Sequence, residues 1–501
     1  MAKKRCTLTR YLVVILTMAL FAQLINFVVP APSIYAKGKS NKTNTVETAN
    51  KAPISCGPGC SHYDVVVIGS EIEGVLLARS AFDQGLSVLI LDPRSKPGGE
   101  LIQGQMLVLD EPNDNRKRSL VQGEIKRLYD GYNAGSIRKL TSFEKYYRKL
   151  IQGLPLKSSV NIDAVKTAQK GNKKSLGELI YRAKDGAKYT VQAEYWVENT
   201  DFNALTSKLG GKRIPGMESI YKGSKPDYMA ATYMLNIKNV DWNQLHQAIL
   251  EDYPLTNVEK KYGQNTYVDW EFATGFSNLT YKYKPTDSQL MLRGLNVTNQ
   301  KNGQVIINGL LIFDVNPADP NSVKTAIRKA QAEAPHIIKY LQRHIPGFDK
   351  AKLGAYPEYL YIRDFNRYGT EYVLDYKDLT SGRMFWDNVT IGGYNTDLQA
   401  TRVISKGVSY GKPNRYGIPL RSFELKSYDN VLVAGKNVGA AIKAYGSARI
   451  IPTTALAGQT IGIILGREWK NGHKMLNQLT QADFVRIHNY LAKDYNIVLN
   501  R

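Results

Sequence analysis

The stretch YDVVVIGSEIEGVLLARSAFDQGLSVLILDPRSKPGG, residues 63–99, decides the fold of this 501-residue chain. Its apolar run Val65–Ile68 is short enough for a strand that is buried on both faces. Gly69 and Gly74 then bracket a tight turn, and apolar side chains recur at helical spacing as far as Gly85. The stretch therefore predicts a strand, a glycine turn and a helix in that order.

A second apolar run, Leu86–Leu91, ends at Asp92, roughly 20 residues after the glycine turn. An acid at that place completes a dinucleotide fingerprint. The helix N-terminus attracts a pyrophosphate, and the carboxylate of Asp92 can accept hydrogen bonds from both hydroxyls of an adenosine ribose. The alternative is an ordinary β-α-β unit of another doubly wound sheet. We favour the nucleotide site because strand, turn, helix and acid fall in register.

Glu71 departs from this fingerprint, because it stands where the middle glycine lets the backbone approach the phosphates. A carboxylate beside a pyrophosphate is repelled unless it turns away or pairs with a cation. Either the pyrophosphate lies further out or the site has decayed, and the sequence leaves both open.

The chain has 67 lysines and arginines against 44 acids, which gives a formal net charge of +23. An excess this large predicts an anionic neighbour, either nucleic acid or an anionic envelope polymer or lipid. The basic residues are scattered, and no basic block carries interleaved aromatics, which argues against nucleic acid. We therefore expect no nucleic-acid partner and an electrostatic association with the cell envelope.

The N-terminus has the layout of an export signal. MAKKR is basic, the run Tyr11–Val29 is apolar, and PAPSIYA precedes a cleavage position after Ala36. The apolar run is also about as long as a segment that spans a bilayer, so an uncleaved membrane anchor is the alternative. Either route predicts an exported protein, extracellular or associated with the cell envelope.

Cysteines are few, and the region after the fingerprint has none. Cys6 lies in the leader, and Cys56-Gly-Pro-Gly-Cys60 can close a small disulfide in an oxidising compartment. A redox pair and two idle thiols are the alternatives. The spacing matches no four-ligand zinc site, and no haem or iron–sulfur pattern is present, so we expect no metal site.

The rest of the chain alternates between helical and strand patterns. The Tyr-rich runs between residues 227 and about 386 predict an antiparallel sheet, interrupted by an amphipathic helix at Val323–His344 whose two histidines have surface or packing roles. The other predicted elements are helices within 120–132 and 141–154, strands near 160–168, 179–183 and 189–197, a buried strand at 430–435 and a helix from Pro452.

This order resembles the FAD-dependent oxidoreductases of the glutathione-reductase-like superfamily, in particular a bacterial group distantly related to fumarate reductase flavoproteins. The resemblance covers most of residues 62–470 and begins with DVVVIG-x-x-x-x-G, an acid and a Gly-Gly pair. Residues 198–201 match the pattern [DE]-A-T-[GE]-D, although Asn199 replaces the usual alanine. The strongest match is the tail, with IGGYNTDLQ, NVLVAGKNVG and YGSARIIPTTALAGQTIG.

The resemblance implies an α/β fold: a discontinuous Rossmann-like FAD-binding domain, with a parallel sheet plus a β-meander, and an inserted α+β antiparallel-sheet substrate domain. The resemblance places the FAD-binding domain at 62–225 and 391–470 and a substrate or cap domain at 226–390. The sequence itself predicts a signal peptide or membrane anchor at 1–36, a flexible linker rich in Lys, Asn, Thr and Ser at 37–61, and a C-terminal helical segment at 471–501.

It also implies FAD as the cofactor. Arg449 and the helix opened by Pro452 would place positive potential beside a reduced flavin. The implied cofactor-binding residues are Gly69, Ser70, Glu71, Glu73, Gly74, Asp92, Arg94, Gly98, Gly99, Val165, Thr200, Asp201, Gly435, Arg449, Pro452 and Thr453.

The implied catalytic residues are Arg363, Tyr394 and Asp397. A family run resembling Arg-Glu-Thr-Arg-x-Ile-x-Gly reads RDFNRYG at 363–369, and Tyr445 replaces a usual histidine. Arg363 would hold a substrate carboxylate with both arms of its guanidinium, or alternatively form a structural ion pair with a nearby acid.

We therefore expect an exported FAD-dependent oxidoreductase that transfers a hydride between a small or saccharide-like substrate and bound flavin. No second nucleotide fingerprint points to a nicotinamide partner, and the sequence predicts no oligomeric state. The alternative is a catalytically decayed flavoprotein fold that acts as an envelope-associated binding protein.

Overall fold

The fingerprint folds as the predicted β-α-β unit. A computed structural model describes residues 53–500, so the predicted signal or anchor and most of the linker lie outside the described residues. Within it β2 (Cys60–Ile68), α2 (Ile72–Asp83) and β3 (Val88–Asp92) follow one another, and β2 and β3 are parallel. The strand is longer than its apolar run because it pairs with β7 from Cys60 onward.

The main sheet has eight strands, six of them in the order β4-β3-β2-β7-β6-β5. The pairs β3–β4, β2–β3, β2–β7 and β7–β20 are parallel, whereas β5, β6 and β7 form an antiparallel meander. A parallel sheet plus a β-meander was the predicted class, and it is confirmed. The remaining strands are β1 (Ile54–Gly57), β4 (Leu156–Ser158), β5 (Asn161–Lys170), β6 (Lys173–Arg182), β7 (Lys188–Glu198) and β20 (Val431–Val433).

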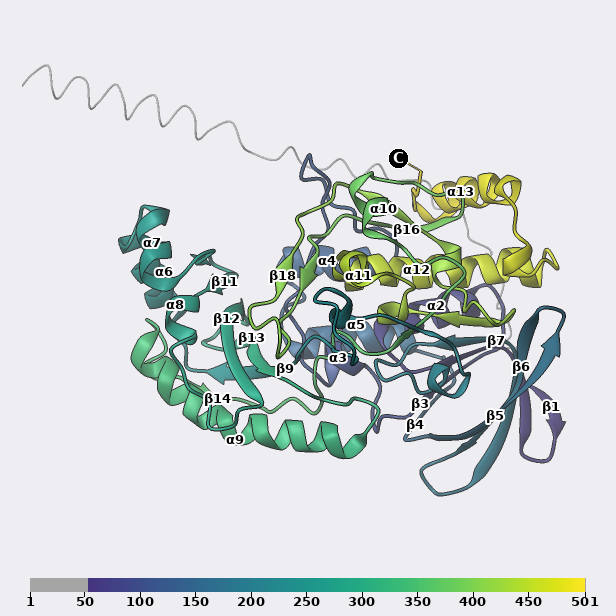
Figure 1. The fold of residues 1–501 in the computed structure, drawn as a ribbon, viewed down its shortest axis with the longest axis horizontal. Coiled ribbons are helices and arrows are strands. Elements are labelled where there is room, and N and C mark those ends of the chain that lie inside the picture. The colour runs from purple at the N-terminus through teal and green to yellow at the C-terminus, as the bar shows by residue number, and fades with distance from the viewer. Residues whose placement is uncertain (1–52, 501) are drawn as a thin grey trace, which may run out of the picture. The chain divides into compact units, whose positions relative to one another are not determined.

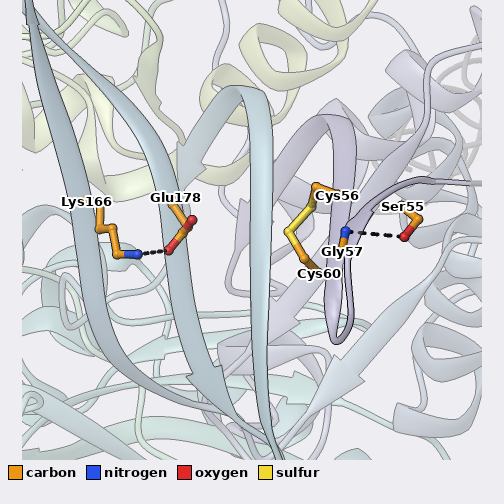
Figure 2. Close-up of a disulfide and its surroundings, with 6 residues drawn as sticks. All are labelled: Ser55, Cys56, Gly57, Cys60, Lys166 and Glu178. Atoms are coloured by element: carbon orange, nitrogen blue, oxygen red, sulfur yellow. Dashed lines mark hydrogen bonds and ion pairs between the residues drawn. A yellow bond between two sulfur atoms is a disulfide. The ribbon is translucent and has the colours of Figure 1, made fainter.

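The cysteine pair closes a hairpin at the start of the described chain. β1 runs antiparallel to β2, and a disulfide joins Cys56 to Cys60 across the turn (Figure 2). The last residues of the predicted linker therefore belong to the sheet. All four residues of β1 are exposed, so the disulfide fastens an edge hairpin rather than the core.

α12 (Ile451–Ile464) packs lengthwise on α2, and Figure 1 shows the two helices side by side. Two glycines of α12 allow this approach. A Cβ at Gly458 would overlap the backbone oxygen of Glu73, and one at Gly462 would overlap the oxygen of Leu77. The C-terminal part of the chain is thereby fixed against the helix that follows the glycine turn.

A second sheet has six antiparallel strands in the order β10-β11-β12-β13-β9-β14. Helix α9 (Pro320–His344) lies along it, as Figure 1 shows, and buries Ala334, Ile337, Ile338 and Leu341. The helix begins at Pro320, three residues before the predicted start at Val323, because Asp319 caps its N-terminus. The strands are β9 (Ala231–Lys238), β10 (Tyr267–Val268), β11 (Phe272–Gly275), β12 (Leu290–Asn299), β13 (Val305–Ile312) and β14 (Lys352–Leu353).

Short strand pairs and helices make up much of the rest of the described chain. Three two-stranded ladders pair β8 (Arg213–Ile214) with β15 (Arg367–Tyr368), β16 (Asn388–Gly392) with β19 (Tyr416–Pro419), and β17 (Asp397–Leu398) with β18 (Val408–Ser409). The remaining helices are α3 (Gly99–Ile102), α4 (Ile125–Asn133), α5 (Leu140–Ile151), α6 (Trp242–Glu251), α7 (Leu255–Tyr262), α8 (Ser277–Thr280), α10 (Tyr376–Thr380), α11 (Ile442–Ala448), a π-helical turn (Leu465–Lys470) and α13 (Gln481–Tyr495).

The second sheet has a hydrophobic core of its own on the α9 side, built from residues between Ala231 and Ile362. The predicted domain boundaries near 225 and 390 stay predictions. Among residues 53–500 no single helix is long and apolar enough to cross a membrane; α11 and the helix after it reach that length only together, across a bend of 82°.

We expect Gly458→Ala to destabilise the protein, although alanine favours a helix over glycine by about 1 kcal/mol. The new methyl group would meet the backbone of α2, which cannot move aside as a flexible side chain can. Urea denaturation of the variant should show a lower midpoint. The control is Gly177→Ala, where the nearest atom to the added Cβ is a backbone oxygen 3.9 Å away. Equal midpoints for Gly458→Ala and wild type would contradict the close packing of the two helices.

Candidate functional site

The glycine turn after β2 is tightly packed. Gly69 has φ +100°, and a Cβ there would lie 2.7 Å from the backbone carbonyl carbon of Asn199, so glycine is required by both backbone conformation and space. In the first turn of α2 the amide of Gly74 donates to Oδ1 of Asn199 at 3.0 Å. The asparagine that replaces the family's alanine therefore occupies one of the helix N-terminal donors.

Glu71, at the start of α2, occupies a donor of the next helix, α3. Its carboxylate forms an ion pair with Arg94 and accepts a hydrogen bond of 3.0 Å from the amide of Glu100. It also lies against Gly99, where any Cβ would overlap it. Of the two ways in which such a carboxylate avoids repulsion, turning away and pairing with a cation, the structure shows the pairing with a cation.

Asp92 ends β3 and is completely buried. Its Oδ1 accepts from the backbone amide of Arg94 at 2.8 Å and from Nε of the same residue at 3.1 Å, and its Oδ2 accepts from Nη2 at 3.0 Å and from the hydroxyl of Ser70. Ser70 in turn accepts from the amide of Gly98 at 3.1 Å. The predicted ribose acceptor is therefore hydrogen-bonded within the protein in this structure.

A buried cluster of carboxyl groups continues from this loop. Lys436 pairs with Glu100 and lies 3.7 Å from Oδ2 of Asp201. Burial, reinforced by Glu100 and Glu71, raises the pKa of Glu73 to about 8. Burial also raises the pKa of Glu100 to about 7, although Lys436 opposes the shift. At neutral pH the cluster therefore retains protons that exposed carboxyl groups would lose.

Other predicted cofactor residues lie around the same cluster. Gly435, with φ +61°, follows β20 and packs beside Glu73, and Pro452 lies in the first turn of α12. Thr200 donates its hydroxyl to Glu198 at 2.8 Å. Val165 is different, because it lies on the edge strand β5, two strands removed from β7, and pairs there with Leu179. The structure does not bring it to the glycine turn.

The three predicted catalytic residues line one cavity of about 120 Å³. Arg363 comes from the segment after β14, and Tyr394 and Asp397 come from the GGYNTD loop. The cavity's other lining residues are Met106, Val108, Asp110, Arg293, Asn296, Asn308, Tyr361 and Gln399, so it lies between the segment that follows α3 and strands β12 and β13.

Arg363 is 2% exposed and forms no ion pair with an acid among residues 53–500. Its Nη1 donates to the carbonyl of Ala230 at 3.0 Å and to Oγ1 of Thr232 at 2.6 Å, and its Nη2 donates to Oδ1 of Asn308 at 3.2 Å. The ion pair in this run belongs instead to Arg367 and Asp364. The alternative of a structural ion pair for Arg363 is therefore wrong.

Two further polar pairs border the cavity. The hydroxyl of Tyr394 donates to Oδ1 of Asp110 at 2.7 Å. Nη2 of Arg449 lies 3.3 Å from Oδ2 of Asp397, and its Nη1 donates to the hydroxyl of Tyr361 at 3.0 Å. Arg449, predicted beside the flavin, thus connects the start of α12 to the cavity.

Sequence reasoning missed several residues of this region. Arg293 on β12 donates a hydrogen bond to Asn308 on β13. The one sequence feature that could have indicated Arg293 is that it is a charged residue within an apolar strand pattern. Tyr445 donates its hydroxyl to the backbone oxygen of Arg363 at 2.9 Å, so the tyrosine that replaces the family's histidine positions that arginine. Lys436 was part of the quoted tail, but no pattern indicated its role.

The model of a protein family described as FAD dependent oxidoreductase matches residues 64–487 of this chain. The chain belongs to this family. It is an FAD-dependent oxidoreductase, and FAD is its cofactor. A search of curated protein sequences gives no match.

Solved structures are similar to this chain only at a distance. A geranylgeranyl bacteriochlorophyll reductase-like protein from Thermoplasma acidophilum is 11% identical, with a TM-score of 0.40 over 87% of this chain and 85% of that one. A flavoprotein/dehydrogenase from Cytophaga hutchinsonii is 12% identical, with a TM-score of 0.39 over 87% and 84%. A myxobacterial chondrochloren halogenase is 11% identical, with a TM-score of 0.36 over 87% and 81%. Values this low carry no argument about the substrate.

The residues present fit FAD, although several of the predicted contact groups are hydrogen-bonded within the protein in this structure. Oδ2 of Asp201 and Oγ1 of Thr453 are buried without a hydrogen-bond partner among the described residues, which suits a polar ligand. Arg94 and Lys436 supply positive charge. Asp92, Arg94 and the amides of the glycine turn would hold the adenosine and pyrophosphate once Glu71 gives up its bonds.

We expect Glu71→Gln to tighten FAD binding by about tenfold, an effect of roughly 1.4 kcal/mol. The amide keeps an oxygen for the Glu100 amide but removes a buried negative charge, which leaves Arg94 available to a phosphate. Retention of FAD on dilution measures the change. The control is Glu358→Gln, which removes a carboxylate paired with Lys96 at an exposed position. Weaker binding in Glu71→Gln would show that the Glu71–Arg94 pair supports the cofactor.

We expect the protonation of Glu73 to make the stability of the protein depend on pH. Its raised pKa means that the folded protein keeps a proton that the unfolded chain has lost, so stability falls as pH rises from about 4.5 toward 8, by at most roughly 1.4 kcal/mol per pH unit. Glu73→Gln keeps an acceptor for the Thr454 hydroxyl and cannot ionise. Its urea midpoint should exceed that of wild type at pH 9 and approach it at pH 5. Parallel profiles for Glu73→Gln and wild type would refute the assignment, and Glu251→Gln serves as the exposed control.

Proposed function

We propose that this FAD-dependent oxidoreductase is exported and transfers a hydride between its flavin and a small or saccharide-like substrate held in the cavity of Arg363, Tyr394 and Asp397. The observation that carries the proposal is that these three residues, from two segments of the chain, line one polar cavity. When bound, FAD supplies the two-electron acceptor or donor. The protein's own groups bind the substrate and handle its proton.

Tyr394 and Asp110 form the pair suited to proton transfer. The tyrosine hydroxyl donates to the aspartate at 2.7 Å, and both residues line the cavity. In the oxidation of an alcohol, the Asp110 carboxylate would accept the hydroxyl proton of the substrate, and bound FAD would supply the acceptor for the hydride from its C–H bond. In the reverse direction the same carboxyl group returns the proton.

Export is supported by the signal layout of residues 1–36 and by the Cys56–Cys60 disulfide, which suits an oxidising compartment. Residues 1–36 contain four basic residues and no acid, so the chain without them keeps a net charge of +19, which further supports retention at the anionic cell envelope. The proposed partners are therefore a small-molecule substrate and envelope polymers or lipids.

The absorbance spectrum of the purified protein tests the flavoenzyme directly. We expect a yellow protein with one FAD per chain, and bleaching of the flavin bands under anaerobic conditions when a substrate is oxidised. A folded, colourless protein that takes up no added FAD would favour the decayed binding protein, with Glu71 and Asn199 as the residues that closed the site.

Cell fractionation followed by a salt wash tests export. Electrostatic contacts weaken as the Debye length falls to about 3 Å in about 1 M salt, whereas a buried apolar anchor is insensitive to ionic strength. We expect the wash to release a chain that begins near Lys37. A chain that still carries residues 1–36 and leaves only with detergent would establish the membrane anchor instead, and recovery in the cytoplasm would refute export.

A further inference from the structure

The cavity is lined by two arginines and two acids, but neither Arg293 nor Arg363 forms an ion pair with an acid among the described residues. Arg363 is buried and hydrogen-bonded only to neutral groups, and burial lowers its pKa to about 10. Asp397 pairs with Arg449, and Asp110 accepts from Tyr394. A buried guanidinium without an acid is costly, so the site suits a ligand that brings the missing negative charge.

Arg293 lies beside Arg363 and shares a partner with it. Oδ1 of Asn308 accepts from Nη2 of Arg293 at 3.1 Å and from Nη2 of Arg363 at 3.2 Å. The two guanidinium groups therefore lie next to each other in the lining of the cavity. Nε of Arg293 is buried without a hydrogen-bond partner among the described residues. Two adjacent guanidinium groups with donors to spare match the paired oxygens of a carboxylate.

The size of the cavity limits what enters it. About 120 Å³ is the volume of roughly four waters, so a carboxylate and a few attached atoms fill it. A larger cleft of about 580 Å³ shares four of its lining residues, Arg293, Asn296, Asp397 and Gln399. The two spaces therefore adjoin, and the rest of a ligand can extend into the cleft.

The cleft is lined by groups that hydrogen-bond to hydroxyls. Its remaining lining residues are mostly amides and hydroxyls, namely Gln264, Asn265, Thr274, Ser277, Asn278 and Tyr281, and it also contains Lys406. Tyr281 is 42% exposed, so part of its side chain is available to a ligand. Few apolar side chains are present, which disfavours an aliphatic or aromatic substrate.

We propose that the substrate is a sugar acid, with its carboxylate held by Arg363 and Arg293 in the cavity and its hydroxyls along the amide-lined cleft. This inference rests on the proposed function for its chemistry, but its binding claim stands apart from turnover. An amino acid, which would use the same arginines and place its ammonium group near Asp110, is the rival that the experiment separates.

The test is calorimetric titration of the FAD-loaded protein with D-glucuronate, D-glucose and L-alanine. We expect D-glucuronate to bind at least about tenfold more tightly than D-glucose, which lacks the carboxylate. Binding of L-alanine at least as tight as that of D-glucuronate would overturn the proposal in favour of the amino acid. Equal affinities for D-glucuronate and D-glucose would overturn it as well.

Two variants identify the carboxylate site. Arg363→Lys keeps the charge but loses the two-armed donor, and Arg293→Gln removes the neighbouring charge. Each variant should lower the affinity for D-glucuronate about tenfold and leave the affinity for D-glucose unchanged. The matched control is Arg402→Gln, which breaks an exposed pair with Asp314 and should bind as wild type does. If Arg363→Lys fails to fold, Arg293→Gln decides the matter. Unchanged affinity in a folded variant would place the carboxylate elsewhere.

Flavin bleaching by D-glucuronate is recorded in the same samples. Binding that follows the arginines without bleaching would uphold the sugar-acid site and refute the proposed hydride transfer. Bleaching by D-glucose or L-alanine instead would uphold hydride transfer and refute the sugar acid.

Discussion

Buried charges must be paired, and Arg94 is where this constraint acts on the fold. Its guanidinium contacts Asp92 at the end of β3 and Glu71 at the start of α2, while Glu71 reaches on to the amide of Glu100 in α3. Three consecutive elements are therefore fixed by one cation. α2 is in turn held against α12 by glycines that admit no side chain, so the C-terminal part of the chain takes its place from the same turn.

The two halves of the site have opposite charge imbalances. Around the glycine turn, Glu71, Glu73, Asp92, Glu100 and Asp201 outnumber Arg94 and Lys436, and the raised pKa values of Glu73 and Glu100 show how protons make up the difference. Around the cavity, Arg293, Arg363 and Arg449 outnumber Asp110 and Asp397. An arginine stays protonated and charged at neutral pH, so the anionic substrate that we propose would supply the missing negative charge there.

Most of the fold could be predicted because it rests on short-range patterns. The apolar runs around Val65–Ile68 and Leu86–Leu91, the glycines between them and the helical spacing of Val323–His344 each specify an element from neighbouring residues alone. The main errors lie at the edges. The sequence predicts β1 as part of the linker because the stretch before it is rich in Lys, Asn, Thr and Ser, and only its pairing with β2 makes it a strand.

The site resisted prediction where a role depends on a partner far along the chain. The sequence indicates that Glu71 must turn away or pair with a cation, and the cation that it pairs with stands 23 residues further along the chain. Arg363 lacks the acid that an ion pair would need because Asp364 turns to Arg367, while its own contacts come from Ala230, Thr232 and Asn308 on the second sheet. No spacing within residues 363–369 records those contacts. A motif can thus predict which residues lie at a site. Their ionisation state, and the ligand charge that they favour, depend on the groups that the tertiary fold places beside them.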